Sequence, residues 1–352
     1  MLKQFAFLFM LLTLSFFGFS NQLVINEDSA SHFGTAQFLI ADEYFSLEEV
    51  RRNNQLNWQD IEVGDTSFGF DSRHFWLKIP LVNVYSSTSP WFLRSKYPLL
   101  DTIDVYLFAD EELIQEFHTG DSLPFNQRPI KQPNFVFPLD INTDKTYSVY
   151  LHVQTSSSLQ LALSLQTESQ FWQAIAAESV TTSAFYSILL SLLLYNLVIF
   201  FIVRARSYLF YVLYLASFTL FMASIHGWGY QYLWPNSPRI HELSVVFLIG
   251  PVIIFGALFS SNFLRLATIR PALNRLILSF VWIAGVYSVA TLILPYTIMI
   301  RIGAALAILA AGIAMLSTIQ EWLRSRSREV LLFIIAWSTL LIGFSLYSGQ
   351  KF

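Results

Sequence analysis

Residues 147–166 read YSVYLHVQTSSSLQLALSLQ, and residues 182–203 read TSAFYSILLSLLLYNLVIFFIV. In the first stretch apolar side chains alternate with more polar ones, which is the period of a β-strand with one buried face. The second stretch is almost purely apolar and has the length of about 20 residues that a helix needs to cross a bilayer. The sequence therefore changes near residue 180 from an alternating to a continuously apolar pattern. This change predicts a water-exposed β domain followed by a membrane domain.

The composition of the chain agrees with a protein that is membrane-embedded over part of its length. Of its 352 residues, 54% are hydrophobic and 16% are aromatic, which exceeds the apolar content of an ordinary soluble domain. A net charge of -3 gives no basic surface of the kind that binds nucleic acid. Since the chain has no cysteine, disulfides, thiolate metal sites and cysteine nucleophiles are excluded.

The first twenty residues predict a secretory signal peptide, residues 1–20. Lys3 supplies the positive start, residues 5–17 the apolar segment, and Gly18 and Ser20 the small residues before a cleavage site. An uncleaved first membrane helix is the alternative interpretation. Both interpretations place the segment that follows outside the cytoplasm.

Residues 21–172 are predicted to form an exported all-β domain, a sandwich or jelly roll. Alternating runs follow one another from Asp71 to about Gln166, and turn residues such as those at 87–90, 120–121 and 156–158 separate them. Because strand follows strand with no helical segment between, the sheets should be antiparallel. One short helix is predicted at Ser46 to Arg52, since Ser46 and Glu49 have the spacing of a capping box.

Residues 173–352 are predicted to form an all-α polytopic membrane bundle of six spans. The spans lie at about 182–203, 208–226, 242–263, 276–295, 297–318 and 329–349. Arginines follow the odd-numbered spans, at 204 and 206, at 265, 270 and 275, and at 324, 326 and 328. The positive-inside rule puts these connections in the cytoplasm. The β domain is then outside, as the signal peptide also predicts.

The connection after the second span is rich in aromatic residues, from Trp228 to Trp234. Such a run is typical of an aromatic belt at the membrane surface. The alternative is a contact surface for the β domain. Six spans would also put the C-terminus outside, and the sequence then predicts no intracellular output domain.

Motifs for catalysis or for a cofactor are absent from the sequence. It contains no Gly-x-Ser-Gly, no His-Glu-x-x-His, no phosphate-binding loop and no histidine after His241. His226 and His241 flank one outer loop and could share a metal, but two lone imidazoles favour interfacial hydrogen bonding. Asn196 and Gly250-Pro251 are the nearest candidates for a transport site, and helix packing explains them more simply. We therefore expect no enzyme, no metal site and no cofactor.

Several runs resemble the bacterial 7TMR-DISM family, seven-helix receptors with diverse intracellular signalling modules. The resembling segments are residues 75–77, 97–101, 105–108, 120–125, 128–130, 134–139, 156–161, 195–196, 208–211 and 227–235. They are spread over most of residues 40–350. The resemblance implies an extracellular jelly-roll sensor of the second DISM type, which binds small ligands such as carbohydrates. It also implies a seventh span and a cytoplasmic signalling module, which this sequence lacks, so we expect a receptor truncated before the seventh helix.

A carbohydrate site needs an aromatic ring for stacking and polar groups beside it. Trp76, which the alternation puts on the wetter sheet face, is a candidate platform. The polar candidates in or next to the family-like runs are Asp71, Arg73, Asp101, Asp121 and Arg128. Each also has a structural interpretation, and Arg128 and Asp121 in particular would pair with each other or with the backbone.

These observations predict a membrane sensory receptor, or a fragment of one, in a bacterial inner membrane with a periplasmic N-terminal domain. Its partners would be the lipid bilayer, a small-molecule or carbohydrate ligand and a cytoplasmic signalling protein, with no nucleic acid. The rival interpretation is a transporter or envelope-assembly protein in which the β domain is an accessory.

Overall fold

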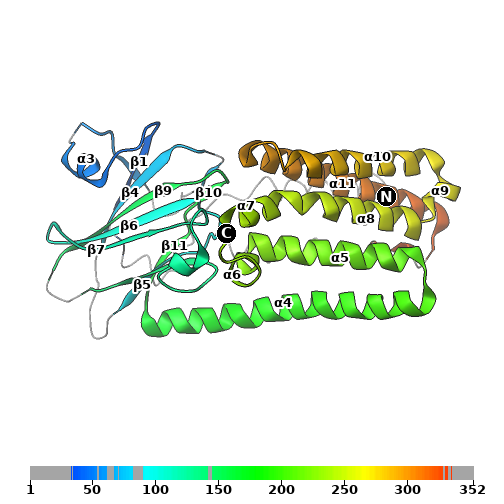
Figure 1. Cartoon of the computed structure of the whole chain (residues 1–352), viewed down its shortest axis with the longest axis horizontal. Coiled ribbons are helices and arrows are strands. Elements are labelled where there is room, and N and C mark those ends of the chain that lie inside the picture. Colours follow the sequence, from blue (N-terminus) through cyan, green and yellow to red (C-terminus); the bar gives the residue numbers. More distant parts are fainter. Residues whose placement is uncertain are drawn as a thin grey trace.

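The computed structural model has two parts, a β domain and a bundle of long helices that extends from one end of it (Figure 1). It describes residues 33, 35–53, 55–61, 67–69, 71–81, 90–141, 145–327, 330, 331 and 334. The predicted signal peptide lies outside the described residues. The predicted sixth span, 329–349, lies outside them except at three positions.

Two antiparallel sheets form the body of the β domain. The larger has six strands in the order β2-β1-β4-β9-β6-β7, the smaller has the order β11-β5-β8, and β10 pairs with β3. Every pairing among the named strands is antiparallel, as predicted. The strands are β1 Ala36–Ala41, β2 Gln59–Ile61, β3 Ser67–Gly69, β4 His74–Leu81, β5 Trp91–Ser95, β6 Thr102–Ala109, β7 Glu112–Thr119, β8 Phe135–Leu139, β9 Tyr147–Gln154, β10 Leu159–Gln160 and β11 Leu163–Thr167.

The core lies between the two sheets and is built by the apolar sets that alternate along the sequence. From the larger sheet come Phe75 and Leu77 of β4 and their counterparts on β6 and β9. From the smaller sheet come Leu93 of β5 and Phe137 of β8. The same cluster also includes Val245, which belongs to a membrane helix. Because one apolar core runs from the sandwich into the bundle, the two parts are packed together.

Helix α3, Leu47–Arg52, covers the part of the outer face of the larger sheet around Trp76. The predicted capping box is confirmed, since the Ser46 hydroxyl accepts from the Glu49 amide and the Glu49 carboxylate accepts from the Ser46 amide. Val50 of α3 packs with Trp76 of β4, whose side chain is 0% exposed. The prediction that Trp76 lies on a wetter face is therefore wrong: it does point away from the inter-sheet core, but a helix covers it.

Helix α4, Glu168–Val203, begins directly after β11 ends at Thr167. A second capping box, between Thr167 and Gln170, starts the helix. The apolar span was predicted from 182, and the preceding 14 residues, 168–181, belong to the same continuous helix and lie beside the β domain. The β domain thus ends about five residues before the predicted boundary at 172. The first turns of α4 are polar and have good helix propensity, so a search for apolar stretches does not detect where the helix begins.

Five helices among the described residues are long and apolar enough to cross a membrane. They overlap the first five predicted spans. The third consists of two consecutive segments, α7 and α8. The named helices after the β domain are α4 Glu168–Val203, α5 Arg206–Ile225, α6 Trp228–Tyr232, α7 Pro238–Phe247, α8 Ile249–Phe263, α9 Leu266–Ile269, α10 Pro271–Ala290 and α11 Tyr296–Ser325. Within the β domain, a 3-10 turn, η1, spans Phe125–Gln127 between β7 and β8.

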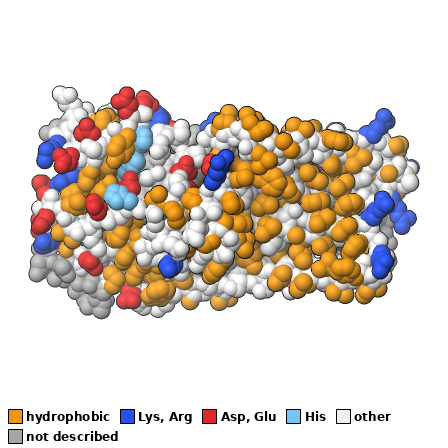
Figure 2. Space-filling model, viewed as in Figure 1, with side chains coloured by type: hydrophobic (Ala, Val, Ile, Leu, Met, Phe, Trp, Pro, Cys, Tyr) orange, Lys and Arg blue, Asp and Glu red, His pale blue; other side chains and the backbone are white. Residues whose placement is uncertain are grey.

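Charges sort along the length of the molecule (Figure 2). Acidic side chains gather over the β domain, a hydrophobic band covers the helices, and basic side chains gather at the far end. The basic residues at the ends of the helices and in the connections there are Arg204, Arg206, Arg265, Arg270, Arg275, Arg324 and Arg326. A band of apolar surface with a basic far end is the pattern of a multi-pass protein whose β domain is extracellular.

The polar groups considered for transport have ordinary packing roles. Asn196 donates to the carbonyl of Leu192 in its own helix at 2.8 Å. Gly250 lets α8 approach α10 closely, because a Cβ there would lie 1.8 Å from the Ser288 hydroxyl oxygen. Asn196 is therefore hydrogen-bonded within its own helix, and Gly250 is explained by helix packing.

Candidate functional site

The loop after β7 brings Asp121 next to Asp101, which directly precedes β6, at the end of the β domain that faces the helices. The Asp121 amide donates to the Leu100 carbonyl at 2.8 Å and the Ser122 amide to the Asp101 carbonyl at 3.3 Å. Between them, a Cβ at Gly120 would lie 1.9 Å from the Asp101 carbonyl oxygen. Glycine is therefore required for the approach that places the two aspartates side by side.

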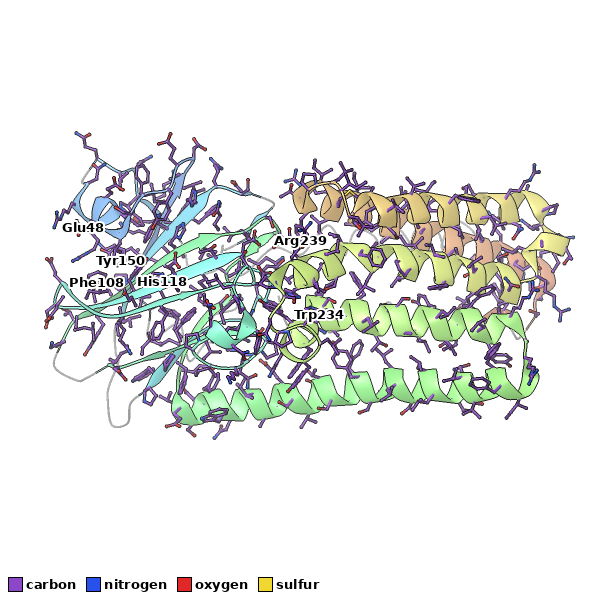
Figure 3. The ribbon with its side chains drawn as sticks, viewed as in Figure 1. Glu48, Phe108, His118, Tyr150, Trp234 and Arg239 are labelled. Carbon is purple, nitrogen blue, oxygen red and sulfur yellow. The ribbon has the colours of Figure 1, made fainter. Side chains whose placement is uncertain are left out.

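The aromatic connection after α5 docks on this loop. It folds into the short helix α6, and the Phe125 amide donates to the Pro235 carbonyl at 2.9 Å. The hydroxyl of Tyr230, which is 0% exposed, donates to the Leu123 carbonyl. Of the two interpretations of this aromatic run, contact with the β domain holds for Tyr230, whereas Tyr232 is 68% exposed. Figure 3 shows Trp234 and Arg239 where the helices meet the β domain.

A buried cluster of titratable side chains lies at this contact and consists of Asp101, Asp121, Arg128 and His241. His241 of α7 stacks on Tyr230 with ring centroids 4.4 Å apart, and its Nε2 lies 3.9 Å from the Asp121 carboxylate. That nitrogen is buried and has no hydrogen-bond partner in the part of the chain that the structure describes. The Arg128 guanidinium donates to the Pro133 carbonyl at 2.5 Å and lies 4.2 Å above the centre of the Phe135 ring. The structural interpretation of Arg128 as a backbone partner therefore holds.

Burial shifts the pKa values of the aspartates and the arginine in this cluster. Burial, followed by the neighbouring Asp101 carboxylate, raises the pKa of Asp121 well above its usual range, and Arg128 opposes the change. Burial also raises the pKa of Asp101, against hydrogen bonds from Ser156 and Thr155. Burial lowers the pKa of Arg128 to about 10, so that it stays charged at neutral pH. The Asp101 and Asp121 carboxyls are buried near each other, so each ionised carboxylate disfavours ionisation of the other.

A cleft of about 430 Å³ opens beside the cluster, between the β domain and the start of α11. Asp71, Ser72 and Ser156 line it from the β domain, and Thr297, Ile298 and Arg301 from α11. The Ser156 amide donates to the Asp101 carboxylate at 2.8 Å. One wall of the cleft is therefore hydrogen-bonded to the buried cluster.

Asp71 and Arg73 form a bonded pair at the edge of this cleft. The Arg73 side chain donates to both carboxylate oxygens of Asp71 at 2.7–3.1 Å, and this lowers the pKa of Asp71. Asp71 lines the cleft, whereas Arg73 is not among its described lining residues. Of the six predicted residues, the structure thus brings Asp101, Asp121 and Arg128 together, puts Asp71 and Arg73 nearby, and leaves Trp76 under α3 on the outer sheet face.

A second connection between the two parts joins β5 to α4. Arg94, whose side chain is 0% exposed, makes a two-pronged ion pair with Glu178 in the part of α4 that precedes the predicted span. Sequence patterning does not indicate this pair, because Arg94 lies in an apolar strand and Glu178 lies 84 residues later.

Sequence reasoning also missed a polar chain on the outer face of the larger sheet. His74 and His152 share a hydrogen bond at 3.0 Å, His152 bonds Asp104 at 2.9 Å, and Asp104 bonds His118 at 3.0 Å. The exposed Tyr44 ring lies edge-on against His74 and His152. The alternation puts these residues on one face, which is the signal that could have found them. In the part of the chain that the structure describes, no three His, Asp or Glu side chains are grouped to hold a metal.

Comparison with known families gives two matches. Residues 178–352 match the family described as "7TM diverse intracellular signalling", and residues 36–167 match the family described as "7TMR-DISM extracellular 2". The second match ends at Thr167, where the β domain ends and α4 begins. No curated protein matches the chain.

Proposed function

This chain belongs to the 7TMR-DISM family of membrane sensory receptors with an extracellular domain, and on that premise we propose that its β domain senses a small polar molecule on the periplasmic side of a bacterial inner membrane. The signal would pass through the junction into the helix bundle. A cytoplasmic signalling protein would receive it at the basic far end of the bundle.

The observation that carries the proposal is the cleft shared by Asp71, Ser72 and Ser156 with Thr297 and Arg301. Its volume of about 430 Å³ lies in the range of small-molecule sites, roughly 300–1,000 Å³. The described lining offers hydroxyls, a carboxylate and a guanidinium but no aromatic ring. A carbohydrate would therefore be held there by hydrogen bonds and not by stacking.

A ligand in this cleft would touch the β domain and a membrane helix at once. Such a ligand favours the arrangement in which both walls are at bonding distance, and it shifts the population toward that arrangement. Ser156 would transmit the shift to Asp101, and the buried pair with Asp121 would transmit it to His241 on α7. The cluster resists gradual deformation because its groups are buried and closely packed.

Binding can be tested with a panel of mono- and disaccharides titrated by calorimetry against the full chain in nanodiscs. The Thr297→Trp variant fills the cleft, and the control Ile293→Trp adds the same ring at a position that is 80% exposed. We expect a sugar that binds the wild type and the control but loses binding at least tenfold in Thr297→Trp. Equal binding by both variants would refute the cleft as the site.

Sensing can be separated from transport in the same chain. Because it has no cysteine, spin labels at Leu113→Cys on β7 and Ile202→Cys on α4 report one distance. A sensor predicts that the sugar changes this distance and does not cross a proteoliposome membrane. Sugar flux without a distance change would favour the transporter.

A further inference from the structure

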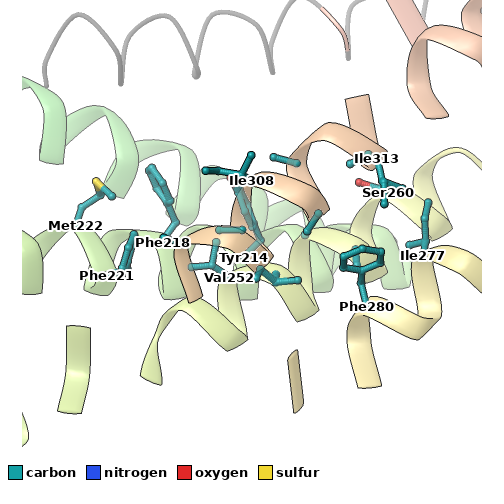
Figure 4. Close-up of a pocket in the computed structure, with 18 residues that line it drawn as sticks. Tyr214, Phe218, Phe221, Met222, Val252, Ser260, Ile277, Phe280, Ile308 and Ile313 are labelled. Carbon is teal, nitrogen blue, oxygen red and sulfur yellow. The ribbon is translucent and has the colours of Figure 1, made fainter. Parts of the chain in front are cut away.

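The helix bundle contains a cavity of about 380 Å³ between α5, α8, α10 and α11 (Figure 4). Its volume is in the range of small-molecule sites. Phe218, Val252, Phe280 and Ala307 contribute to a mostly apolar lining, and Tyr214 and Ser260 are the hydroxyl-bearing residues among the described lining. The cavity is within the membrane-spanning segments and separate from the cleft at the junction.

The Ser260 hydroxyl is exceptional among the buried hydroxyls of the bundle. In a membrane helix such a group normally donates to the carbonyl four residues earlier. Ser224, Ser288 and Thr318 do so at 2.8–2.9 Å. Ser260 is 1% exposed, and among the described residues its oxygen has no hydrogen-bond partner. A buried polar group without a partner is unfavourable, so a missing partner in the adjoining cavity accounts for it.

The lining also defines the charge and the source of that partner. None of the described lining residues is Asp, Glu, Lys, Arg or His, so a charged ligand would be buried without a counter-ion. Ile308 of the lining is 50% exposed on the outside of the bundle. The cavity therefore adjoins the apolar outer surface of the bundle, and the bilayer is the source from which an occupant would come.

We propose that this cavity binds a neutral molecule from the bilayer, with a hydrocarbon body and one hydroxyl or carbonyl oxygen that hydrogen-bonds to Ser260. An occupant between four helices would bias their packing in the same way as the ligand at the junction. The proposal goes beyond the proposed function and does not depend on it.

The test uses a photoreactive hexadecanol with a diazirine in its chain and the full chain in phosphatidylcholine nanodiscs. After illumination, labelled peptides are mapped by mass spectrometry. We expect saturable labelling of α8 and α11 around Val252 and Ala307, and unlabelled hexadecanol should compete with it. Labelling spread evenly over lipid-facing residues, without saturation, would overturn the proposal.

Two variants sharpen the test. Ala307→Trp fills the cavity and should reduce labelling at least fivefold, whereas Leu309→Trp, at a position that is 59% exposed, should not. Ser260→Ala keeps the cavity and removes the hydrogen bond. It should weaken competition by hexadecanol on the order of threefold to tenfold and leave competition by hexadecane unchanged. An equal response to both competitors in Ser260→Ala, or unchanged labelling in Ala307→Trp, would contradict the assignment.

Discussion

The ion pair between Arg94 and Glu178 joins the β domain to α4, and Glu178→Leu tests what it contributes. The substitution leaves the Arg94 guanidinium, 0% exposed, without its carboxylate. Breaking a fully buried pair in this way destabilises a fold by about 3–5 kcal/mol. Because the Glu178 side chain is 39% exposed, solvent already screens part of the interaction, and we expect about 2–3 kcal/mol.

The expected readout is the thermal transition of the β domain, followed by near-ultraviolet circular dichroism in nanodiscs. For a domain of this size, a loss of that magnitude lowers Tm by about 6–10 °C. The control Gln173→Leu changes an exposed residue of the same helix and should leave Tm within about 2 °C of the wild type.

A double variant decides whether the effect comes from the buried charge. Arg94→Met with Glu178→Leu replaces both partners by apolar groups, and such a replacement is close to neutral. We expect it to recover most of the lost Tm. A single variant that melts like the wild type, or a double variant as unstable as the single one, would refute the reasoning.

Three further outcomes follow from the structure. The raised pKa of Asp121 means that the folded state holds a proton that the unfolded chain releases, so this contribution to stability is complete below the unfolded pKa and is lost as pH rises through the folded pKa. Asp121→Asn should therefore raise Tm at pH 8, with a difference that disappears near pH 4, and a constant difference across this range would contradict the cause. Trp76→Ala should lower stability by about 3–5 kcal/mol in denaturant unfolding, whereas Tyr44→Ala, at a ring that is 54% exposed, should change it by less than about 0.5 kcal/mol. Gly227→Ala should destabilise by about 1–2 kcal/mol in the same assay, since φ at that position is +75° and an added Cβ would lie 3.1 Å from the Pro133 carbonyl oxygen; a neutral result would show that the junction relaxes easily.

The candidate site was only partly predictable. Asp101, Asp121 and Arg128 could be chosen because they are polar residues in or next to apolar, family-like runs. Their meeting with His241 could not, because that histidine lies 120 residues after Asp121 and is brought in by the docking of α6 and α7. Trp76 was misjudged for a related reason: alternation separates the two faces of a strand but does not tell what covers each face.

The sequence by itself determined the two-part architecture, the antiparallel strands and the first five of its six predicted spans, and it predicts the orientation of those spans in the membrane. Each of these depends on a pattern within one segment or on the charge of its ends, which a linear reading contains. Only the tertiary structure decided that Ser156 bonds Asp101, that Arg94 pairs with Glu178, and that Ser260 has no partner among the described residues and lies beside a cavity. Those features arise where segments far apart in the chain pack together, and packing depends on shape and on partners that no local period encodes.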